Sequence, residues 1–560
     1  MENDHLLTRR DLMRHGAAIT LATAGSSIGG AFAQDGAHTV ATGTVFEDRS
    51  GTGVRHHDDP GIAGVLVSNG RDVVRTDRDG RYALPVDDAS IIFVIKPAGY
   101  AVPAESGVML PHFYYIHQPG GTPAHLGLRY GGIAPTGALP PAIDFPLRRA
   151  EEAGRFDVLM FADLHAGSAA DIDYIRADLV NPLIGTKAAF GITAGDIVSD
   201  NLSLYGRCNR IVGQLGLPWH NVVGNHDLNL DAAEPRYSRE TFKQTFGPTC
   251  YAFEYAGALF FILDNVEHLG AGTAADCRYR GRFGKQQLAF VANVLEATPP
   301  DRLVVAVMHI PLRSDLDPQD PTSNTADCAE FLKLLGDRPA VSFSGHMHTT
   351  EHHYLGAQDG SCASAPHHHH VLTAASGSWW SGPYDHRGVA VADSEDGTPN
   401  GFHVLSIDGA RYATRFRPAK EPNARQLRIV LDGGAPHPDK AGDDSIGTLF
   451  GAPIPRERLA ATEVLVNVFD GGPRTLVEYR IGGRAPVRMN RERRLDPFVR
   501  EVFARNRSSK KPWVKAEPSS HLWAARLPAD IEAGVHCIRV RVVDEYGREH
   551  EDHLVLEVVG

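Results

Sequence analysis

The chain has 560 residues, of which 42% are hydrophobic, and its 56 basic and 68 acidic side chains give a formal net charge of −12 at pH 7. This composition indicates a globular protein that is too long for one hydrophobic core, and about two to four domains are expected. The acidic balance and the scattered Lys and Arg exclude a nucleic-acid-binding stripe. The short basic run 490–494 is explained more simply as a solvated loop.

The first 33 residues resemble a twin-arginine export signal. Arg9 and Arg10 precede a weakly apolar segment rich in Ala and Gly, and Ala31-Phe32-Ala33 offers a cleavage site. A membrane anchor is the alternative, but the segment is too short and too rich in Gly, Ser and Thr to span a bilayer. The resemblance implies export of the folded protein, through the twin-arginine translocation machinery, to the periplasm or beyond.

The cysteine content fits an oxidising compartment without fixing any pairing. The number is even, and the residues are Cys208, Cys250, Cys277, Cys328, Cys362 and Cys537. Disulfides and buried free thiols are equally compatible with this pattern. The absence of a Cys-x-x-Cys pair excludes a zinc ribbon or a thioredoxin-type site.

Residues 34–135 are predicted to form a small β-sandwich. Segments such as SIIFVIKP and VVRTDRDGRYALPV have strand character, with polar and apolar residues alternating in the second, and turn signals such as Asp79-Gly80 separate the predicted strands. VVRTDRDGRYALPV resembles the transthyretin-like or carboxypeptidase-regulatory modules of secreted enzymes. The passage 131–149, rich in Pro and Gly, is interpreted as a linker.

The pattern changes over residues 150–416, where short apolar runs alternate with helix-like stretches such as KQQLAFVANVLEA. Fully apolar strands separated by helices are typical of a sheet covered on both faces, so an α/β domain with a layered β-sheet core covered by helices is predicted. Alternating patterns return over residues 425–560, which predicts a second β-sandwich. No cluster of chemistry-bearing residues was found in either flanking domain.

The central strands end in side chains that can bind metal. These residues are Asp163-Leu164-His165, Gly195-Asp196, Gly224-Asn225-His226-Asp227, His309 and Gly345-His346-Met347-His348. In open α/β sheets the carboxyl ends of the strands meet at one crevice, so residues far apart in the sequence are expected to converge there. The glycines are expected to let the backbone approach the site closely.

The order D-x-H, GD, GNH(D/E), H, GHxH is the signature of the calcineurin-like metallophosphoesterases, and the chain resembles that family over roughly 155–416. The flanking β domains and the segments around 345–408 are similar to a secreted bacterial branch. The resemblance implies hydrolysis of phosphoesters by water activated at two divalent cations. It assigns Asp163, His165 and His348 to one cation, Asn225, His309 and His346 to the other, and Asp196 to both.

The family likeness also implies that His226 is the acid that assists the leaving group. Asp227 is expected to orient the His226 ring, although capping of the next segment would also explain it. For Asp200 the favoured interpretation is helix capping rather than a role beside the site. Asp264-Asn265 is equally compatible with a turn and with an approach to the site.

His369, His370, Trp379 and Trp380 are candidates for substrate contacts. His369 and His370, with His352 and His353, could line the mouth of the site, or they could form an ordinary polar loop. Trp379 and Trp380 could form a stacking wall, while core packing of at least one of them explains the pair as well.

The leading hypothesis is therefore a periplasmic dinuclear-metal phosphoesterase. A catalytically silent envelope-binding protein is the alternative, but such a protein is expected to have lost a ligand or His226, and none is missing. Asp, Asn and His side chains accept Mn, Fe, Zn or Mg, so the sequence fixes neither the metal nor the choice between monoester, diester and pyrophosphate substrates.

Overall fold

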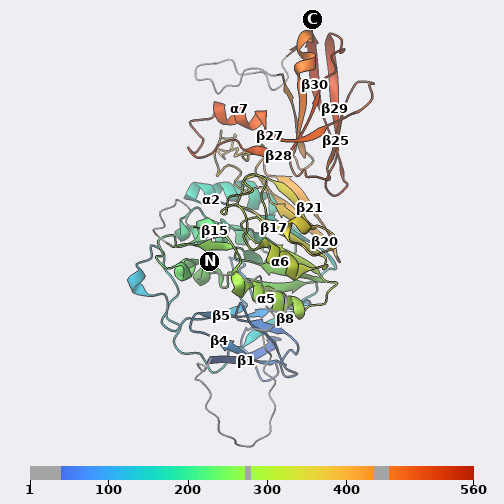
Figure 1. Ribbon diagram of the computed structural model, residues 1–560. Helices are drawn as coiled ribbons and strands as arrows, with labels where there is room; N and C mark the ends of the chain where they lie inside the picture. The colour runs from blue at the N-terminus through green and yellow to red at the C-terminus, as the bar shows by residue number, and fades with distance from the viewer. Residues whose placement is uncertain (1–38, 271–278, 434–452) are drawn as a thin grey trace, which may run out of the picture.

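The computed structural model describes residues 39–270, 279–433 and 453–560. They form an N-terminal β-sandwich, a central layered domain and a C-terminal β-sandwich, which follow one another along the molecule (Figure 1). The predicted export signal at residues 1–33 lies outside the described residues, as does Cys277. The other five cysteines are free thiols. None of the described helices combines the length and apolar character needed to cross a bilayer.

The N-terminal sandwich consists of two four-stranded sheets with the orders β4-β1-β8-β6 and β3-β2-β5-β7. Alternation is clear in β4, where Tyr82, Leu84 and Val86 are buried. The strands are β1 (Thr39–Glu47), β2 (Leu66–Ser68), β3 (Val73–Arg75), β4 (Arg81–Val86), β5 (Ser90–Ile95), β6 (Tyr100–Ala101), β7 (Tyr114–His117) and β8 (Phe145–Arg149), and a short 3-10 helix, η1, covers Ala124–Leu126.

The passage 131–149 is not simply a linker, because it ends in strand β8. This strand pairs in parallel with β1, with Phe145 opposite Val45, and so lies inside a sheet of the sandwich. The hydroxyl of Tyr82 donates to the carbonyl of Ile143 at 2.7 Å. The N-terminal domain therefore extends to Arg149 instead of ending at 135. Local composition could not show this, because β8 is defined by pairing with a strand far earlier in the chain.

The central domain contains two mixed sheets with the orders β11-β10-β9-β20-β21 and β12-β13-β16-β17-β19-β18. Its strands are β9 (Arg155–Phe161), β10 (Phe190–Thr193), β11 (Trp219–Asn221), β12 (Tyr251–Tyr255), β13 (Ala258–Ile262), β16 (Leu303–Val307), β17 (Ala340–Ser344), β18 (Glu351–Leu355), β19 (His367–Val371), β20 (Gly401–Asp408) and β21 (Arg411–Pro418), with β14 (Val266–His268) and β15 (Tyr279–Gly281) as a separate ribbon.

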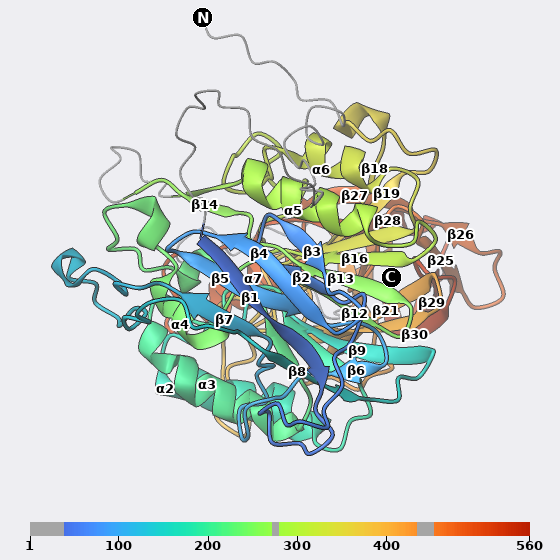
Figure 2. The ribbon, with the colours of Figure 1, turned by 90° about the horizontal axis from the view of Figure 1, so that it is seen from below.

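Helices cover this pair of sheets on two sides, with α2 and α3 on one side and α5 and α6 on the other (Figure 2). They are α2 (Ala169–Ile175), α3 (Tyr205–Val212), α4 (Glu240–Phe246), α5 (Gly284–Glu296) and α6 (Cys328–Leu335), with short turns η2 (Arg176–Val180), η3 (Asn181–Leu183), η4 (Leu202–Leu204), η5 (Gly213–Leu215), η6 (Asn225–Asp227), η7 (Pro235–Tyr237) and η8 (Ala357–Asp359). The inner faces of the sheets share one core that includes Met160, Ile192, Phe260 and Val305.

The predicted layered β-sheet core with helical cover is therefore confirmed, while its division into two sheets was not part of the prediction. Strands β10 and β16 are buried along their whole length. Such strands have both faces covered, which explains why they read as continuous apolar runs.

The C-terminal sandwich has sheets of the orders β22-β24-β28-β27 and β23-β30-β29-β25-β26. Two side chains of this sandwich hydrogen-bond with the central domain. The hydroxyl of Ser520 donates to the carbonyl of Thr350 at 3.0 Å, and His521 pairs with Asp396 at 2.8 Å. The elements are β22 (Leu427–Asp432), β23 (Ile454–Pro455), η9 (Arg456–Ala461), β24 (Glu463–Val468), β25 (Leu476–Ile481), β26 (Val487–Arg488), β27 (Asn490–Leu495), α7 (Pro497–Arg505), β28 (Pro518–Arg526), β29 (Gly534–Val543) and β30 (Glu549–Val559).

Candidate metal centre

The strand ends of the two central sheets meet at one place. Strands β9, β10 and β11 are parallel neighbours in one sheet, and β16 and β17 are parallel neighbours in the other. Their carboxyl ends therefore point the same way. All seven predicted ligands lie directly beyond these ends, and they are Asp163, His165, Asp196, Asn225, His309, His346 and His348.

Six of these side chains form two adjacent groups in which the ligand atoms lie within 4.8 Å of one another. One group is Asp163, His165 and His348, and the other is Asp196, His309 and His346. The Oδ2 atom of Asp196 lies 3.3 Å from Nε2 of His309 and also 3.4 Å from Nε2 of His165 in the other group. The Asp196 carboxylate thus lies between the two groups, as a shared ligand must.

Hydrogen bonds at the far side of the rings fix which imidazole nitrogen is free. His309 Nδ1 lies 2.9 Å from the carbonyl of Ala194, and His348 Nδ1 lies 2.5 Å from the carbonyl of Gly377. A carbonyl can only accept, so both Nδ1 atoms carry the proton, and in the neutral rings both Nε2 atoms are left with a lone pair.

These nitrogens face further ligand atoms. His309 Nε2 is 2.9 Å from Oδ1 of Asn225, and His348 Nε2 is 2.9 Å from Nε2 of His165, whose Nδ1 hydrogen-bonds with Ser199. Imidazole nitrogens and carboxylate and amide oxygens that converge in a buried site require protons or a metal cation between them. Imidazole nitrogen, carboxylate and amide oxygen are ligands for divalent metals, and the carbonyls behind the rings hold them in the ligating tautomer. The donor set therefore fits a metal centre.

The charges of the apo site support the same conclusion. Burial raises the pKa of Asp163 to about 7. Burial also acts to raise the pKa of Asp196, but His309 and His226 hold it well below its usual range. Burial by itself would lower the pKa of His309, and Asp196 instead raises it to about 9. Among the described residues, no Lys or Arg pairs with either carboxylate, so only protonated imidazoles balance the site when no metal is bound.

The backbone of the ligands is strained. Asp163, His165, Asp196, His346 and His348 all have positive φ, at 52°, 46°, 51°, 77° and 53°. The left-handed region costs a non-glycine residue about 1–2 kcal/mol. Such strain persists only where the surrounding structure imposes it, and it concentrates at functional sites.

Two glycines allow the loops to approach the acidic ligands, as predicted. A Cβ on Gly224 would lie 2.1 Å from Oδ1 of Asp196, and a Cβ on Gly345 would lie 2.3 Å from Oδ2 of Asp163. Neither position has room for a side chain. The glycines of the GNH and GHxH blocks are therefore explained by space at the carboxylates.

His226 lies beside the metal ligands and is partly exposed to solvent. Its side chain is 32% exposed, its backbone N–H donates to Oδ1 of Asp196 at 2.9 Å, and its ring lies 5.1 Å from that of His165. Burial by itself would lower the pKa of His226, but Asp196 and Asp200 raise it to about 9. The ring is therefore charged at neutral pH in the metal-free protein, and it can give a proton.

The partner of this ring is Asp200 and not Asp227, so the orienting role expected for Asp227 is wrong. His226 Nδ1 lies 2.8 Å from Oδ1 of Asp200. The Asp227 carboxylate is fully buried and accepts from the backbone N–H groups of Gly224 and Ile197 and from the hydroxyl of Tyr205. Asp227 therefore fixes the loops that carry the ligands. The position of Asp200, four residues after Asp196 on the same strand-end loop, was the available signal.

The two tryptophans have different places. The ring of Trp379 stacks on His348 with centroids 3.6 Å apart and lies 5.6 Å from His165. Trp380 is 5% exposed, and its indole N–H donates to the carbonyl of Leu164 at 2.9 Å. Trp379 can form a wall of the site, whereas Trp380 is a core residue.

His369 and His370 do not line the mouth of the site, because both are completely buried in β19. His369 accepts from the backbone N–H of Leu312 at 3.1 Å, and Nε2 of His370 lies 3.0 Å from Oδ1 of Asp470. A run of polar residues suggested an exposed loop. In the fold the run is a strand between β17 and β18, and all five of its residues are buried, so both of its faces are covered.

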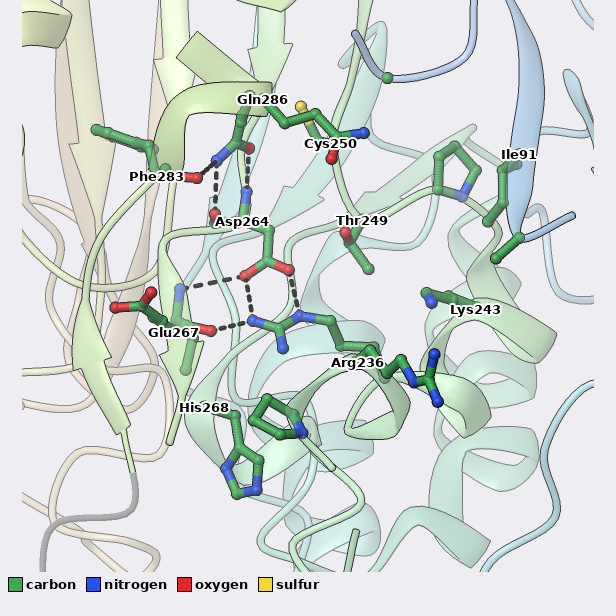
Figure 3. Close-up of a pocket in the computed structure, with 18 of the residues that line it drawn as sticks. Ile91, Arg236, Lys243, Thr249, Cys250, Asp264, Glu267, His268, Phe283 and Gln286 are labelled. Carbon is green, nitrogen blue, oxygen red and sulfur yellow. Dashed lines mark hydrogen bonds and ion pairs between the residues drawn. The ribbon is translucent and has the colours of Figure 1, made fainter. Parts of the chain in front are cut away.

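Asn265 supports the centre, while Asp264 faces away from it. Asn265 Oδ1 accepts from the backbone N–H groups of His309 at 3.2 Å and Ile310 at 3.0 Å. Asp264 pairs with Arg239. It lines a pocket of about 460 Å³ between the N-terminal and central domains (Figure 3). No predicted ligand lines this pocket, so it is separate from the metal centre.

Three family models match the chain, and together they cover most of it. The model described as "Calcineurin-like phosphoesterase" matches residues 156–350. The model described as "N terminal of Calcineurin-like phosphoesterase" matches residues 49–126, and the one described as "C terminal of Calcineurin-like phosphoesterase" matches residues 369–550. The last match begins inside β19 and ends inside β30, so it includes β20 and β21 of the central domain as well as most of the C-terminal sandwich. No curated protein matches the chain.

Two solved structures are similar to parts of the chain. A dimetal phosphatase from Danio rerio is 15% identical with a TM-score of 0.34, over 48% of this chain and 97% of its own. A purple acid phosphatase from seeds of yellow lupin (Lupinus luteus) is 13% identical with a TM-score of 0.34, over 64% of this chain and 68% of its own.

Proposed function

Because the chain belongs to the calcineurin-like phosphoesterase family, we propose that it hydrolyses phosphoester bonds at a centre of two divalent cations. The observation that carries this proposal is the place of the Asp196 carboxylate, within 3.4 Å of an imidazole nitrogen from each of the two ligand groups. A single cation would not require a carboxylate between two such groups.

Each of the two groups of ligands would hold one cation. Asp163, His165 and His348 would hold one cation, Asn225, His309 and His346 the other, and Asp196 both. Cations bound there supply charge neutralisation for the phosphoryl oxygens and activation of the attacking water. Mn, Fe, Zn and Mg are all compatible with these ligands.

In the proposed reaction His226 gives a proton to the leaving oxygen. Asp200 accepts from Nδ1 and so directs Nε2 away from itself, toward the open side of the centre. Trp379 forms one wall, through its stacking on His348. The pair His226–Asp200 therefore adds acid assistance to the chemistry of the cations.

The cellular location forms a separate part of the proposal. The twin-arginine-like segment with Arg9 and Arg10 supports export to the periplasm. The measurement is cell fractionation of the full-length chain beside an Arg9→Lys, Arg10→Lys variant. Equal amounts of both proteins in the periplasmic fraction would contradict this route.

The activity is tested with purified protein loaded with Mn²⁺, Zn²⁺ or Mg²⁺. Nitrophenyl monoesters, nitrophenyl diesters and pyrophosphate are compared on the same sample, with metal content measured in parallel. We expect turnover of at least one class, abolished in Asp196→Ala. A fully loaded protein that cleaves none of them would support a silent binding protein instead.

A further inference from the structure

A second cluster of His and Asp side chains lies where the central domain meets the C-terminal sandwich. His352 belongs to β18 and His370 to the neighbouring strand β19, while Asp470 follows β24 of the C-terminal sandwich. Their exposed fractions are 2%, 0% and 8%. The cluster shares no residue with the metal centre described above.

The three side chains lie in contact with one another. Oδ1 of Asp470 lies 3.1 Å from Nε2 of His352 and 3.0 Å from Nε2 of His370, and the two imidazoles stack with centroids 3.9 Å apart. A fourth side chain, His403 of β20, has its Nδ1 atom 3.8 Å from Oδ2 of Asp470. Elements from both central sheets and from the C-terminal sandwich therefore meet at this carboxylate.

Several of these buried polar atoms have no hydrogen-bond partner among the described residues. They are Nδ1 and Nε2 of His370, Nδ1 of His403 and Oδ2 of Asp470. Nε2 of His370 lies within contact of the Asp470 carboxylate but is not oriented to hydrogen-bond with it. Buried polar groups nearly always have a partner, so these unpartnered imidazole and carboxylate atoms indicate an occupant.

We propose that His352, His370 and Asp470 bind a third cation, of the zinc class, that fastens the C-terminal sandwich to the central domain. In a tetrahedral site with bonds of 2.0–2.1 Å, neighbouring ligand atoms are about 3.3 Å apart, close to the separations seen here. Two imidazoles and one carboxylate favour Zn²⁺ over Ca²⁺ or Mg²⁺, which prefer oxygen ligands.

A chain of hydrogen bonds behind the cluster suits this role. His352 Nδ1 lies 2.9 Å from Nε2 of His368, and His368 Nδ1 lies 2.9 Å from the hydroxyl of Tyr412. Without a cation, Nε2 of His352 hydrogen-bonds with Oδ1 of Asp470. A bound cation would take the place of that proton, and the proton would then lie on Nδ1, which can donate to His368. Ligating histidines are commonly held in this way by a partner on the second nitrogen.

The test uses full-length protein with Asp196→Ala as the background, because that change weakens the catalytic centre. The protein is loaded with Zn²⁺ alone and desalted, and zinc is measured together with near-UV circular dichroism. Adding Asp470→Asn is expected to remove about one further zinc ion per chain. The matched control adds His367→Gln to the same background. His367 is a buried histidine on the same strand as His370, and its side chain hydrogen-bonds with Ser342 and not with the cluster.

A second measurement does not depend on the variants. Anomalous diffraction at the zinc edge from the zinc-loaded wild-type chain is expected to show a peak between His352, His370 and Asp470. If that peak is absent, or if Asp470→Asn holds as much zinc as its background, the cluster is a network of protons and not a metal site. Neither result depends on phosphoesterase activity, so this inference and the proposed function can fail separately.

Discussion

The Nδ1 atom of His226 lies 2.8 Å from Oδ1 of Asp200, and this contact joins the loop after β11 to the loop after β10. The carboxylate directs the ring and raises its pKa together with Asp196. The acid of the proposed reaction is thus positioned by a residue that is distant in sequence, while the adjacent Asp227 holds the backbone.

Replacing His226 with Ala is expected to leave both cations bound and to lower the rate on alkyl esters by about 100-fold or more, the usual range for a general acid. The loss on nitrophenyl esters is expected to be clearly smaller, because nitrophenolate leaves without a proton. The measurements are metal content and rates over leaving groups of graded basicity. An equal loss for every ester would remove His226 from the acid's role.

Replacing Asp200 with Asn tests the positioning of the ring. We expect a loss of about 10-fold on alkyl esters, as for other groups that orient an active imidazole. Because Asp200 raises the pKa of His226, its loss lowers that pKa, and the alkaline limb of the pH–rate profile moves to lower pH. The control is Asp301→Asn on an exposed loop. An unmoved alkaline limb would contradict the assignment.

Metal content distinguishes the shared ligand from the single ligands. Asp196→Ala is expected to lower the content of both catalytic cations, because one carboxylate serves both groups. Asn225→Ala is expected to empty mainly one of them. Elemental analysis after desalting decides the point, with the proposed third cation counted separately through Asp470→Asn. An Asp196→Ala protein that retains both catalytic cations would show that this carboxylate does not bridge.

Gly224→Ala tests the close approach at the centre. The new methyl group would lie 2.1 Å from Oδ1 and 2.2 Å from the backbone nitrogen of Asp196, so the loop must shift. A shift of about 1 Å in a group of the site costs about 100-fold in rate, which is the loss expected here. Gly257→Ala is the control, since a Cβ there meets nothing within 4 Å. Comparable rates for the two variants would mean that the loop yields without disturbing Asp196.

Glu395, at the interface with the C-terminal sandwich, is expected to make stability depend on pH. Burial raises its pKa to about 8, from about 4.5. Between these values the folded chain keeps the proton that the unfolded chain releases, so the contribution of Glu395 falls as pH rises, by roughly 1.4 kcal/mol per pH unit at most.

Glu395→Gln removes this titration and keeps an acceptor for the backbone N–H of Lys515. Urea midpoints of the variant and the wild type are compared from pH 5 to 8, with Glu296→Gln on the surface as control. The variant is expected to gain stability relative to the wild type as pH rises. A constant difference over this range would show that Glu395 is already ionised at pH 5.

The sequence by itself determined the chemistry of the centre and the class of the fold. Asp163, Asp196 and His309 each follow a run of apolar residues, and the convergence of strand ends is a general property of such sheets. The family order of five blocks was also visible without coordinates, because it depends on residue type and spacing alone. The same local patterns identified the two flanking sandwiches.

The tertiary structure decided which residues meet when they belong to different elements. The partnership of His226 with Asp200, the place of β8 beside β1, and the approach of Asp470 to His370 all depend on pairing across long stretches of chain. The polar run at 367–370 is buried for the same reason, since segments distant in the sequence, among them those of Leu312 and Asp470, pack against its side chains. Local patterns report which face of an element is apolar, whereas the neighbours that cover that face are chosen by the packing of the whole fold.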